Sequence, residues 1–265
     1  MSLTIAHGPL AGKPAATNYR IEGPARRLFF EDFPRHVRAV FAGETILDSR
    51  AGKLLHETSL LPQLYVPRED VRLDLCEATD HATHCPYKGA ASYWSVRRQN
   101  RIAENAVWTY PEPSDAAPWL RGYLAVYWDT MDTWFDEDEE IQGHLRDPYH
   151  RVDVRESSRH VRVIVGGQLV AETRRPKVLS ETGLPNRFYI APEDVRRDSL
   201  EPSGTRTACP YKGITTYRTV MLDGHRIVDA AWVYEQPLEN ALKVRDHVCF
   251  LAGGVKVEVD GDKAA

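Results

Sequence analysis

The amino-acid sequence predicts an all-β, or at least β-dominated, protein with short helical turns, built from two tandem copies of one domain. Two observations support this prediction. Blocks of residues recur at a fixed separation of 124 positions, which is typical of an internal duplication. Between those blocks the sequence consists of short runs of residues that favour β-strands, separated by turn residues. No segment shows the hydrophobic periodicity of a long helix together with capping residues at its ends.

The repeat needs no insertion or deletion over its clearest part. Arg-His-Val-Arg at residues 35–38 returns at 159–162, and Cys-Pro-Tyr-Lys-Gly at 85–89 returns at 209–213. From Arg35 to Pro113, 30 of the 79 positions are identical to the residue 124 positions later. We therefore expect both halves to share one strand order.

Three segments follow from the repeat. We expect a first β domain over residues 1–135 (with an N-terminal extension), an acidic linker over 136–148 and a second β domain over 149–265. The two domains would form an intramolecular pseudo-dimer, as a fused homodimer does.

Each copy is expected to contain the same elements in the same order. A hairpin turns at Gly43 or at Gly166-Gly167, a short strand follows, and a proline with acidic residues then starts one helical turn. Two half-buried strands come next. A final hairpin closes each copy, predicted from residues 123–127 with 131–135, and from 247–251 with 255–259.

Composition excludes several classes of protein. The chain has 42% hydrophobic and 27% charged residues, a net charge of −4 and a pI of about 6.2. It therefore lacks the excess of basic residues that is typical of proteins that bind nucleic acids. No apolar run reaches the roughly 20 residues that span a bilayer. Residues 1–20 do not follow the pattern of a secretory signal, so we expect a cytoplasmic protein.

The repeated motif also carries a family resemblance. Cys-Pro-Tyr-Lys-Gly, followed about twenty residues later by Trp-x-Tyr, resembles the domain of unknown function 427 family over nearly all of both copies. The resemblance implies a compact β fold similar to the tent-like sheets of zinc-binding methionine sulfoxide reductases, without their metal-binding cysteine pairs. Family members are sometimes labelled nucleotidyltransferase-like. The chain has neither a Gly-rich phosphate loop nor a repeated Asp-x-Asp, so that activity is the weakest alternative.

Two Lys–acid pairs are candidates for chemistry. Lys88 and Lys212 could hold an anionic ligand or act as bases, or they could be surface residues that cover a tyrosine. Glu57 and Glu181 fall in an expected loop and could be general bases. They could instead form structural ion pairs, with the preceding arginines, Arg50 and Arg174, as the obvious partners.

Cys85 and Cys209 are candidate nucleophiles, although a buried turn residue is the simpler interpretation. No pair of cysteines has zinc-knuckle spacing and no histidine set repeats, so neither a metal nor another cofactor is expected.

Aromatic residues recur as a set and suggest a pocket for a small molecule of unknown identity, in one or both domains. The protein would then be a binding protein or a metal-independent enzyme that uses Lys and Glu. The alternative is a non-catalytic interaction scaffold in which the same rings form the core. The candidate ligand-binding residues are Tyr65, Tyr87, Trp94, Trp108, Tyr189, Tyr211 and Trp232.

Overall fold

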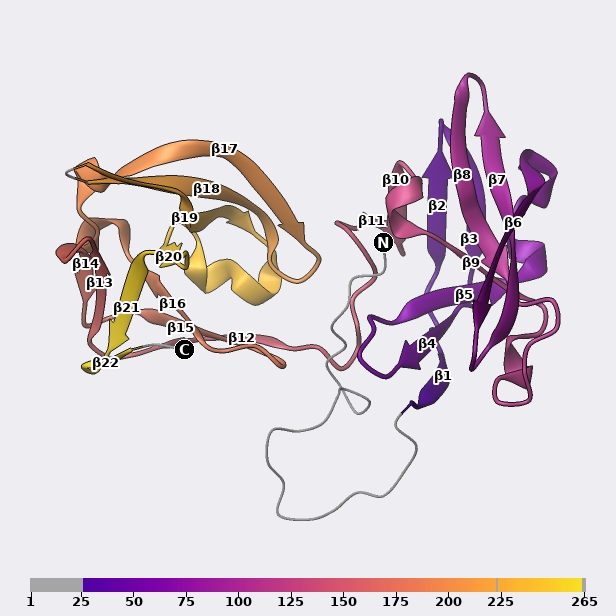
Figure 1. Ribbon diagram of the computed structural model, residues 1–265, viewed down its shortest axis with the longest axis horizontal. Coiled ribbons are helices and arrows are strands. Elements are labelled where there is room, and N and C mark those ends of the chain that lie inside the picture. Colours follow the sequence, from indigo (N-terminus) through magenta and orange to yellow (C-terminus); the bar gives the residue numbers. More distant parts are fainter. Residues whose placement is uncertain (1–25, 223, 264–265) are drawn as a thin grey trace, which may run out of the picture. The chain divides into compact units, whose positions relative to one another are not determined.

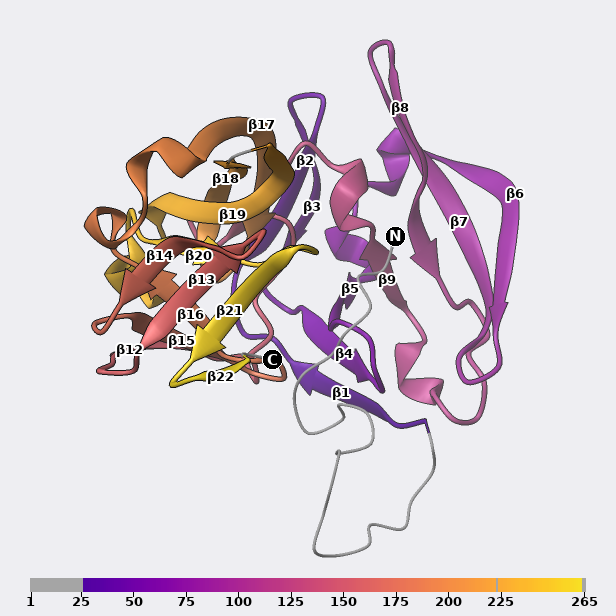
Figure 2. The same ribbon diagram turned by 60° about the vertical axis from the view of Figure 1, so that its left-hand side comes forward.

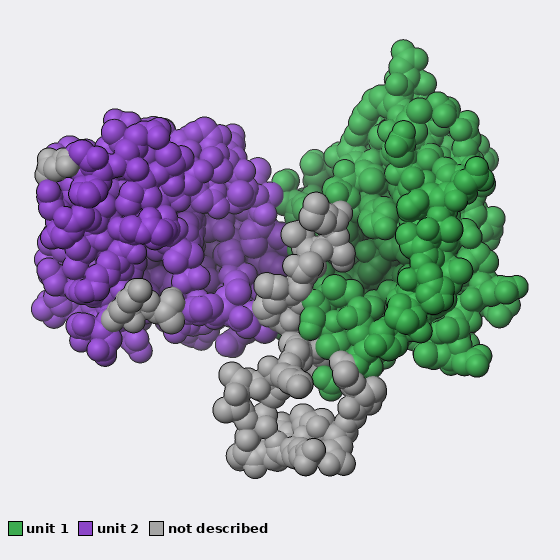
Figure 3. Space-filling view, viewed as in Figure 1, with its two compact units in different colours: residues 1–149 green, residues 150–265 purple. Residues whose placement is uncertain are grey.

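The computed structural model describes residues 26–222 and 224–263 and divides the chain into two compact units, residues 1–149 and 150–265 (Figure 3). The expected N-terminal extension lies mostly outside the described residues. The described chain is mostly β, with no helix of seven residues or more (Figure 1). Within it, no helix is long and apolar enough to cross a membrane.

The first unit contains two antiparallel sheets. The smaller sheet has the order β11 (Glu139–Glu140), β10 (Thr133–Asp136), β2 (Val37–Phe41), β3 (Glu44–Ser49). The larger sheet has the order β1 (Leu28–Asp32), β4 (Lys53–Glu57), β5 (Gln63–Pro67), β9 (Tyr123–Val126), β8 (Arg101–Thr109), β7 (Gly89–Arg98), β6 (Cys76–Cys85).

The second unit repeats this topology strand for strand, which confirms the tandem duplication and the β fold. Its smaller sheet has the order β22 (Asp262–Lys263), β21 (Val255–Val259), β13 (Val161–Val165), β14 (Gln168–Thr173). Its larger sheet has the order β12 (Val152–Glu156), β15 (Lys177–Glu181), β16 (Arg187–Ile190), β20 (Val248–Phe250), β19 (His225–Pro237), β18 (Gly213–Leu222), β17 (Leu200–Cys209).

Short 3-10 helices connect the strands, including the expected turns after β5 and β16. Each of these two begins at or just after a proline and has acidic residues in its first turn, as the sequence predicts. The described 3-10 helices are η1 (Arg68–Asp70), η2 (Leu73–Leu75), η3 (Pro118–Leu120), η4 (Trp128–Thr130), η5 (Pro192–Asp194), η6 (Arg197–Ser199) and η7 (Glu239–Val244).

The first predicted hairpin of each copy is present as β2–β3 and β13–β14. The predicted final hairpin is wrong in both copies. In the first unit β9 pairs with β5 and β8, so both of its edges are occupied and β10 pairs with β2 in the other sheet. In the second unit β20 and β21 are separated in the same way. The segment between these strands therefore passes from one sheet to the other.

The acidic run that we expected to be a linker lies in the first unit. Asp136 ends β10, and Glu139 and Glu140 form the short edge strand β11. The side chain of Asp136 is nearly buried and pairs with Arg35 at 2.7 Å. Part of this run therefore contributes to the smaller sheet.

In the first unit, both faces of the larger sheet carry clusters of buried residues. One face packs against the smaller sheet and forms the main core, to which Leu54, Leu64 and Val107 contribute. Their chain neighbours Leu55, Tyr65 and Trp108 point to the opposite face, because successive side chains of a strand alternate. That second face carries the aromatic residues, and Ala117 and Leu120, in and beside η3, pack against them.

Candidate functional site

The Cys-Pro-Tyr-Lys-Gly motif forms the tight turn between β6 and β7, and its copy forms the turn between β17 and β18. The amide of Lys88 donates to the carbonyl of Cys85 at 3.3 Å, and the amide of Ser114 donates to the carbonyl of Lys88 at 3.0 Å. The second contact ties the turn to the segment that follows β8. The motif therefore fixes where the Lys88 side chain enters the fold.

Glycine ends the motif for a steric reason. Gly89 has a φ of +103°, and a Cβ atom there would lie 3.0 Å from the carbonyl oxygen of Glu112. Gly213 has a φ of +99°, and its Cβ would lie 3.1 Å from the carbonyl oxygen of Gln236. Any larger residue would meet both backbone strain and a backbone clash, so the duplicated glycine is explained by the fold.

Lys88 and Glu57 form an ion pair on the aromatic side of the larger sheet. Lys88 Nζ donates to Glu57 Oε2 at 2.5 Å, and the two side chains are only 11% and 5% exposed. Arg26 binds the other carboxylate oxygen, with Nε at 3.1 Å from Oε1 and Nη2 also in contact. The group is a three-residue cluster of two cations and one carboxylate.

The surroundings of Glu57 correct two expectations. Glu57 is the last residue of β4, so it belongs to a regular strand and not to a loop. Its partners are Lys88 and Arg26, whereas Arg50 lies exposed in the turn after β3. In the second unit Glu181 ends β15 and Arg174 is exposed. In each unit the strand directs the glutamate toward the lysine of the motif, and the preceding arginine is not its partner.

Glu57 is held in its charged form. Burial alone would raise its pKa, but the ammonium of Lys88 and the guanidinium of Arg26 hold the pKa below its ordinary value. Lys88 Nζ also lies 5.7 Å from the centroid of the Tyr110 ring. The cluster therefore has a net charge of +1 at neutral pH and faces an aromatic surface.

The second unit repeats the ion pair with one changed partner. Lys212 pairs with Glu181 Oε2, and His150 Nε2 lies 3.0 Å from Glu181 Oε1 in the place that Arg26 occupies in the first unit. The His150 ring packs 4.1 Å from the centroid of the Tyr211 ring. Burial alone would raise the pKa of Glu181, but His150 and Lys212 hold it below its ordinary value.

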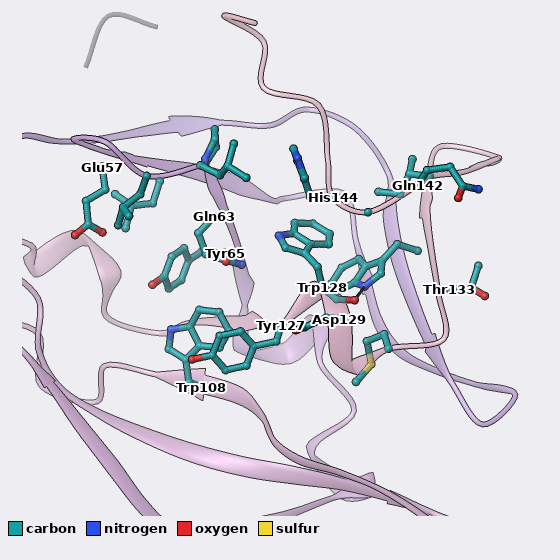
Figure 4. A pocket seen from close by; sticks show the side chains of 18 of the residues that line it. Glu57, Gln63, Tyr65, Trp108, Tyr127, Trp128, Asp129, Thr133, Gln142 and His144 are labelled. Carbon is teal, nitrogen blue, oxygen red and sulfur yellow. Dashed lines mark hydrogen bonds between the residues drawn. The ribbon is translucent and has the colours of Figure 1, made fainter. Parts of the chain in front are cut away.

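A cavity of about 810 Å³ lies beside the cluster of the first unit. Glu57 and Lys88 line one end of it. Figure 4 places Glu57 at that end and Thr133 and Gln142 at the far end. The aromatic residues of the lining are Tyr65, Tyr93, Trp108, Tyr110, Tyr127, Trp128 and Trp134.

The rings of this cavity pack against one another. The centroids of Trp108 and Tyr127 are 4.3 Å apart with a 32° tilt, and Tyr65 meets Trp108 edge to face at 6.2 Å. Trp134 packs on Trp128 at 4.1 Å and donates from Nε1 to the Trp128 carbonyl at 3.1 Å. Burial raises the pKa of Tyr127 to about 12, with Tyr93 adding to the shift. The cavity thus has aromatic walls, and its lining also contains Glu57, Lys88, Asp129, Asp132 and Glu140.

Some of the predicted ligand residues lie elsewhere. Tyr87 is 41% exposed, with the Arg26 guanidinium 5.7 Å from its ring centroid. Trp94 packs against the core between the sheets, with Arg68 above its ring. Neither residue lines the cavity of the first unit. Tyr211 is buried beneath His150.

The other predicted residues lie on the aromatic side of the larger sheets. Trp232 donates from Nε1 to the hydroxyl of the fully buried Tyr189 at 3.0 Å. Cys85 and Cys209 are half-buried at the ends of β6 and β17 and pack against the aromatic clusters of their units. Each is thus the last residue of a strand, next to the motif turn, and neither is fully buried.

Several residues of these sites were not anticipated. Arg26 and His150 lie before the strongly matching stretch. The fixed separation of 124 residues identifies them as equivalent positions of the two copies, but it does not show that they contact the glutamates. Tyr127 and Trp128 correspond to Leu251 and Ala252, so no repeated pattern points to them. In the described residues, no group of three His, Cys, Asp or Glu side chains is placed to hold a metal ion.

The fold and the paired clusters define a tandem β protein with one ion-pair motif in each unit. The chain belongs to the domain of unknown function 427 family (DUF427), which matches it twice, over residues 29–137 and 153–261. No curated protein was found to match the chain.

Proposed function

We propose that the first unit binds a small molecule with a flat ring in its aromatic cavity. One observation carries the proposal: the same cavity of about 810 Å³ is lined both by a set of aromatic rings and by a buried ion pair. Sites for small molecules in proteins have volumes of roughly 300–1,000 Å³ and combine apolar walls with a few polar groups. Ring stacking on Trp108 and Tyr127 would supply the main contact.

Lys88 would supply the polar contact, because it lines the cavity beside Glu57 whereas Arg26 does not. Its ammonium favours a ligand with an anionic or strongly accepting group at this end. Glu57 has a lowered pKa and both of its oxygens are bound, which makes it a weak base. We therefore favour binding over a metal-independent reaction in which Lys88 and Glu57 transfer protons, and we do not propose nucleotidyl transfer.

A second candidate function is a scaffold, and one observation favours it. The Lys–Glu pair recurs in the second unit, where Leu251 and Ala252 stand in the positions of Tyr127 and Trp128. The pair would then serve mainly to brace the motif turn against the end of β4 or β15. The two candidates differ in whether the aromatic wall takes up a ligand.

Exchange of residues between the two units separates these candidates. Saturation-transfer NMR on the full chain, with naphthoate and naphthol as probes, would compare the parent protein with the double variant Tyr127→Leu, Trp128→Ala. We expect both probes to bind the parent protein, and naphthoate to bind more tightly than naphthol because its carboxylate can contact Lys88. The double variant should have an affinity at least tenfold lower for both probes. Ile102→Ala, at an exposed position outside the cavity lining, is the control. Absence of binding, or equal binding by the double variant, would overturn the proposal.

A further inference from the structure

The second unit contains a cavity of about 510 Å³ between its two sheets. Val163 of β13 and Val257 of β21, which are paired in the smaller sheet, lie on one wall. Phe188 of β16 and Phe250 of β20 lie on the other wall. Figure 2 shows β13, β14 and β21 in front of the larger sheet of this unit. Phe188 and Val257 are only half-buried, so the cavity is open to solvent.

Strand register identifies the residue of the first unit that corresponds to Val257. In the first unit Trp134 pairs with Ala39, and in the second unit Val257 pairs with Val163. Ala39 and Val163 are 124 positions apart, within the gapless part of the repeat. Val257 therefore occupies the position of Trp134.

Two indole rings fill the corresponding space in the first unit. Trp134 is only 4% exposed in the core between the sheets, Trp128 packs against that core, and the two ring centroids are 4.1 Å apart. The second unit has Ala252 and Val257 at these positions, and both line its cavity. A methyl and an isopropyl group thus stand where the first unit has two indoles, and the cavity lies beside them.

The opposite wall has changed in the other direction. Phe188 and Phe250 stand where the first unit has Leu64 and Val126. Aromatic rings favour offset-stacked or edge-to-face contacts with other rings. The second cavity has therefore lost the two indoles of one side and gained two phenyl rings on the other, which favours an aromatic ligand.

A hydrogen-bond acceptor is also repeated at this place. In the first unit Trp134 donates from Nε1 to the carbonyl of Trp128 at 3.1 Å. The equivalent carbonyl, that of Ala252, accepts from the amide of Val255 at 3.1 Å. A carbonyl oxygen has two lone pairs, so this one can accept a second hydrogen bond from the N–H of a bound ring.

The lining favours a neutral ligand. Among the described residues that line this cavity, Arg187 is the one with a charged side chain. Successive side chains of a strand alternate, so Arg187 shares the face of β16 that carries Tyr189, opposite to Phe188 and Ile190. A charged ligand between the sheets would therefore lose its hydration without gaining an ion-pair partner from this strand.

We infer that the second unit binds a neutral bicyclic aromatic molecule with a ring N–H, of the indole type, in the space that Trp128 and Trp134 fill in the first unit. The volume of the cavity lies within the range of small-molecule sites in proteins. The inference does not depend on the ring-binding cavity proposed for the first unit.

Isothermal titration of the full chain with indole and benzofuran tests the inference. Benzofuran has nearly the same shape but no N–H donor, so we expect indole to bind about fivefold more tightly at this site. Because indole could also enter the cavity of the first unit, the titrations include Tyr127→Leu, which alters that cavity alone. Indole binding to the second unit should persist in Tyr127→Leu, and indole should raise the melting temperature of this variant.

Two further variants test the location. Ala252→Trp and Val257→Trp each restore one indole of the first unit, and each should weaken indole binding to the second unit at least tenfold. The two positions give independent tests if one of the variants does not fold. Val228→Trp, at a 51% exposed position outside the cavity lining, is the control for adding an indole and should bind like the parent.

The inference is overturned if Tyr127→Leu binds no indole, or if binding in that background survives Ala252→Trp and Val257→Trp unchanged. Equal affinities for indole and benzofuran would overturn the hydrogen bond to Ala252 and with it the ligand class. Ala252→Trp also provides the background in which naphthol reports on the first unit alone, so this inference and the proposed function can fail separately.

Discussion

The ammonium of Lys88 and the carboxylate of Glu57 lie 2.5 Å apart, on elements separated by 31 residues in the sequence. Lys212 and Glu181 keep the same relationship in the second unit. A buried charge that loses its partner is costly, so each pair couples the motif turn to the end of a strand in the larger sheet.

Removal of Lys88 should therefore destabilise the first unit. We expect Lys88→Met to lower the free energy of unfolding by about 3 kcal/mol, because Glu57 stays buried with only Arg26 as its partner. Lys53→Met is the matched control, since Lys53 pairs with an exposed carboxylate, that of Asp32, and should cost at most about 1 kcal/mol. Urea denaturation measures both values, and equal effects of the two substitutions would show that the Lys88 pair is not structural.

The acid stability of the protein should depend on Glu57. The pKa of Glu57 is lower in the folded state than its ordinary value of 4.5, so the unfolded state binds more protons. Stability contributed by this carboxylate is present above about pH 4.5 and is lost as the pH falls through the folded pKa. Thermal melts from pH 6 down to about pH 3 should show a shallower decline for Glu57→Gln than for the parent. Parallel curves would contradict this prediction.

Buried tyrosines should make the protein sensitive to alkali. Burial raises the pKa of Tyr65, Tyr110, Tyr189 and Tyr234 above the ordinary value of 10.0. The unfolded chain releases these protons first, so stability should fall as the pH rises above about 10. Titration of tyrosinate absorbance should show a late phase that coincides with loss of β circular dichroism. A single phase complete before unfolding would be inconsistent with the buried rings.

The glycine of the motif should be intolerant of substitution. Gly89→Ala adds a Cβ atom 3.0 Å from a backbone oxygen, at a φ of +103°, and we expect a loss of about 2–3 kcal/mol. Gly122→Ala is the control, because Gly122 also has a positive φ but has no atom within 4 Å of its added Cβ. That control should cost about 1 kcal/mol. Denaturation of both variants checks the difference.

Much of the fold could be predicted from the repeat and from turn chemistry. The hairpin at Gly43 and the turn after β5 were predicted because local residues determine them. Strand β6 was not predicted, because its sequence is polar and lacks alternation, and it forms through pairing with β7. The final hairpin, predicted from β9 and β10, was incorrect for the same reason. Each of these strands pairs with strands that are distant in sequence, β5 for β9 and β2 for β10, and this pairing determines the sheet to which it belongs.

The candidate site was only partly predictable for the same reason. The repeat identified Lys88, Glu57 and Trp108 as candidates, and the structure brings all three to one cavity. Arg26 could not be assigned as a partner, because its contact with Glu57 depends on the pairing of β1 with β4.

The tandem arrangement has a consequence for how this protein can evolve. A homodimer made from a single gene carries every substitution twice, so a change that suits one subunit is imposed on the other. In this chain, Trp128 and Ala252 occupy one position of the same fold and have diverged, while Lys88 and Lys212 have stayed the same. Selection can thus act on the two copies separately at positions that line cavities, while it preserves in both the lysine that couples the motif turn to the larger sheet.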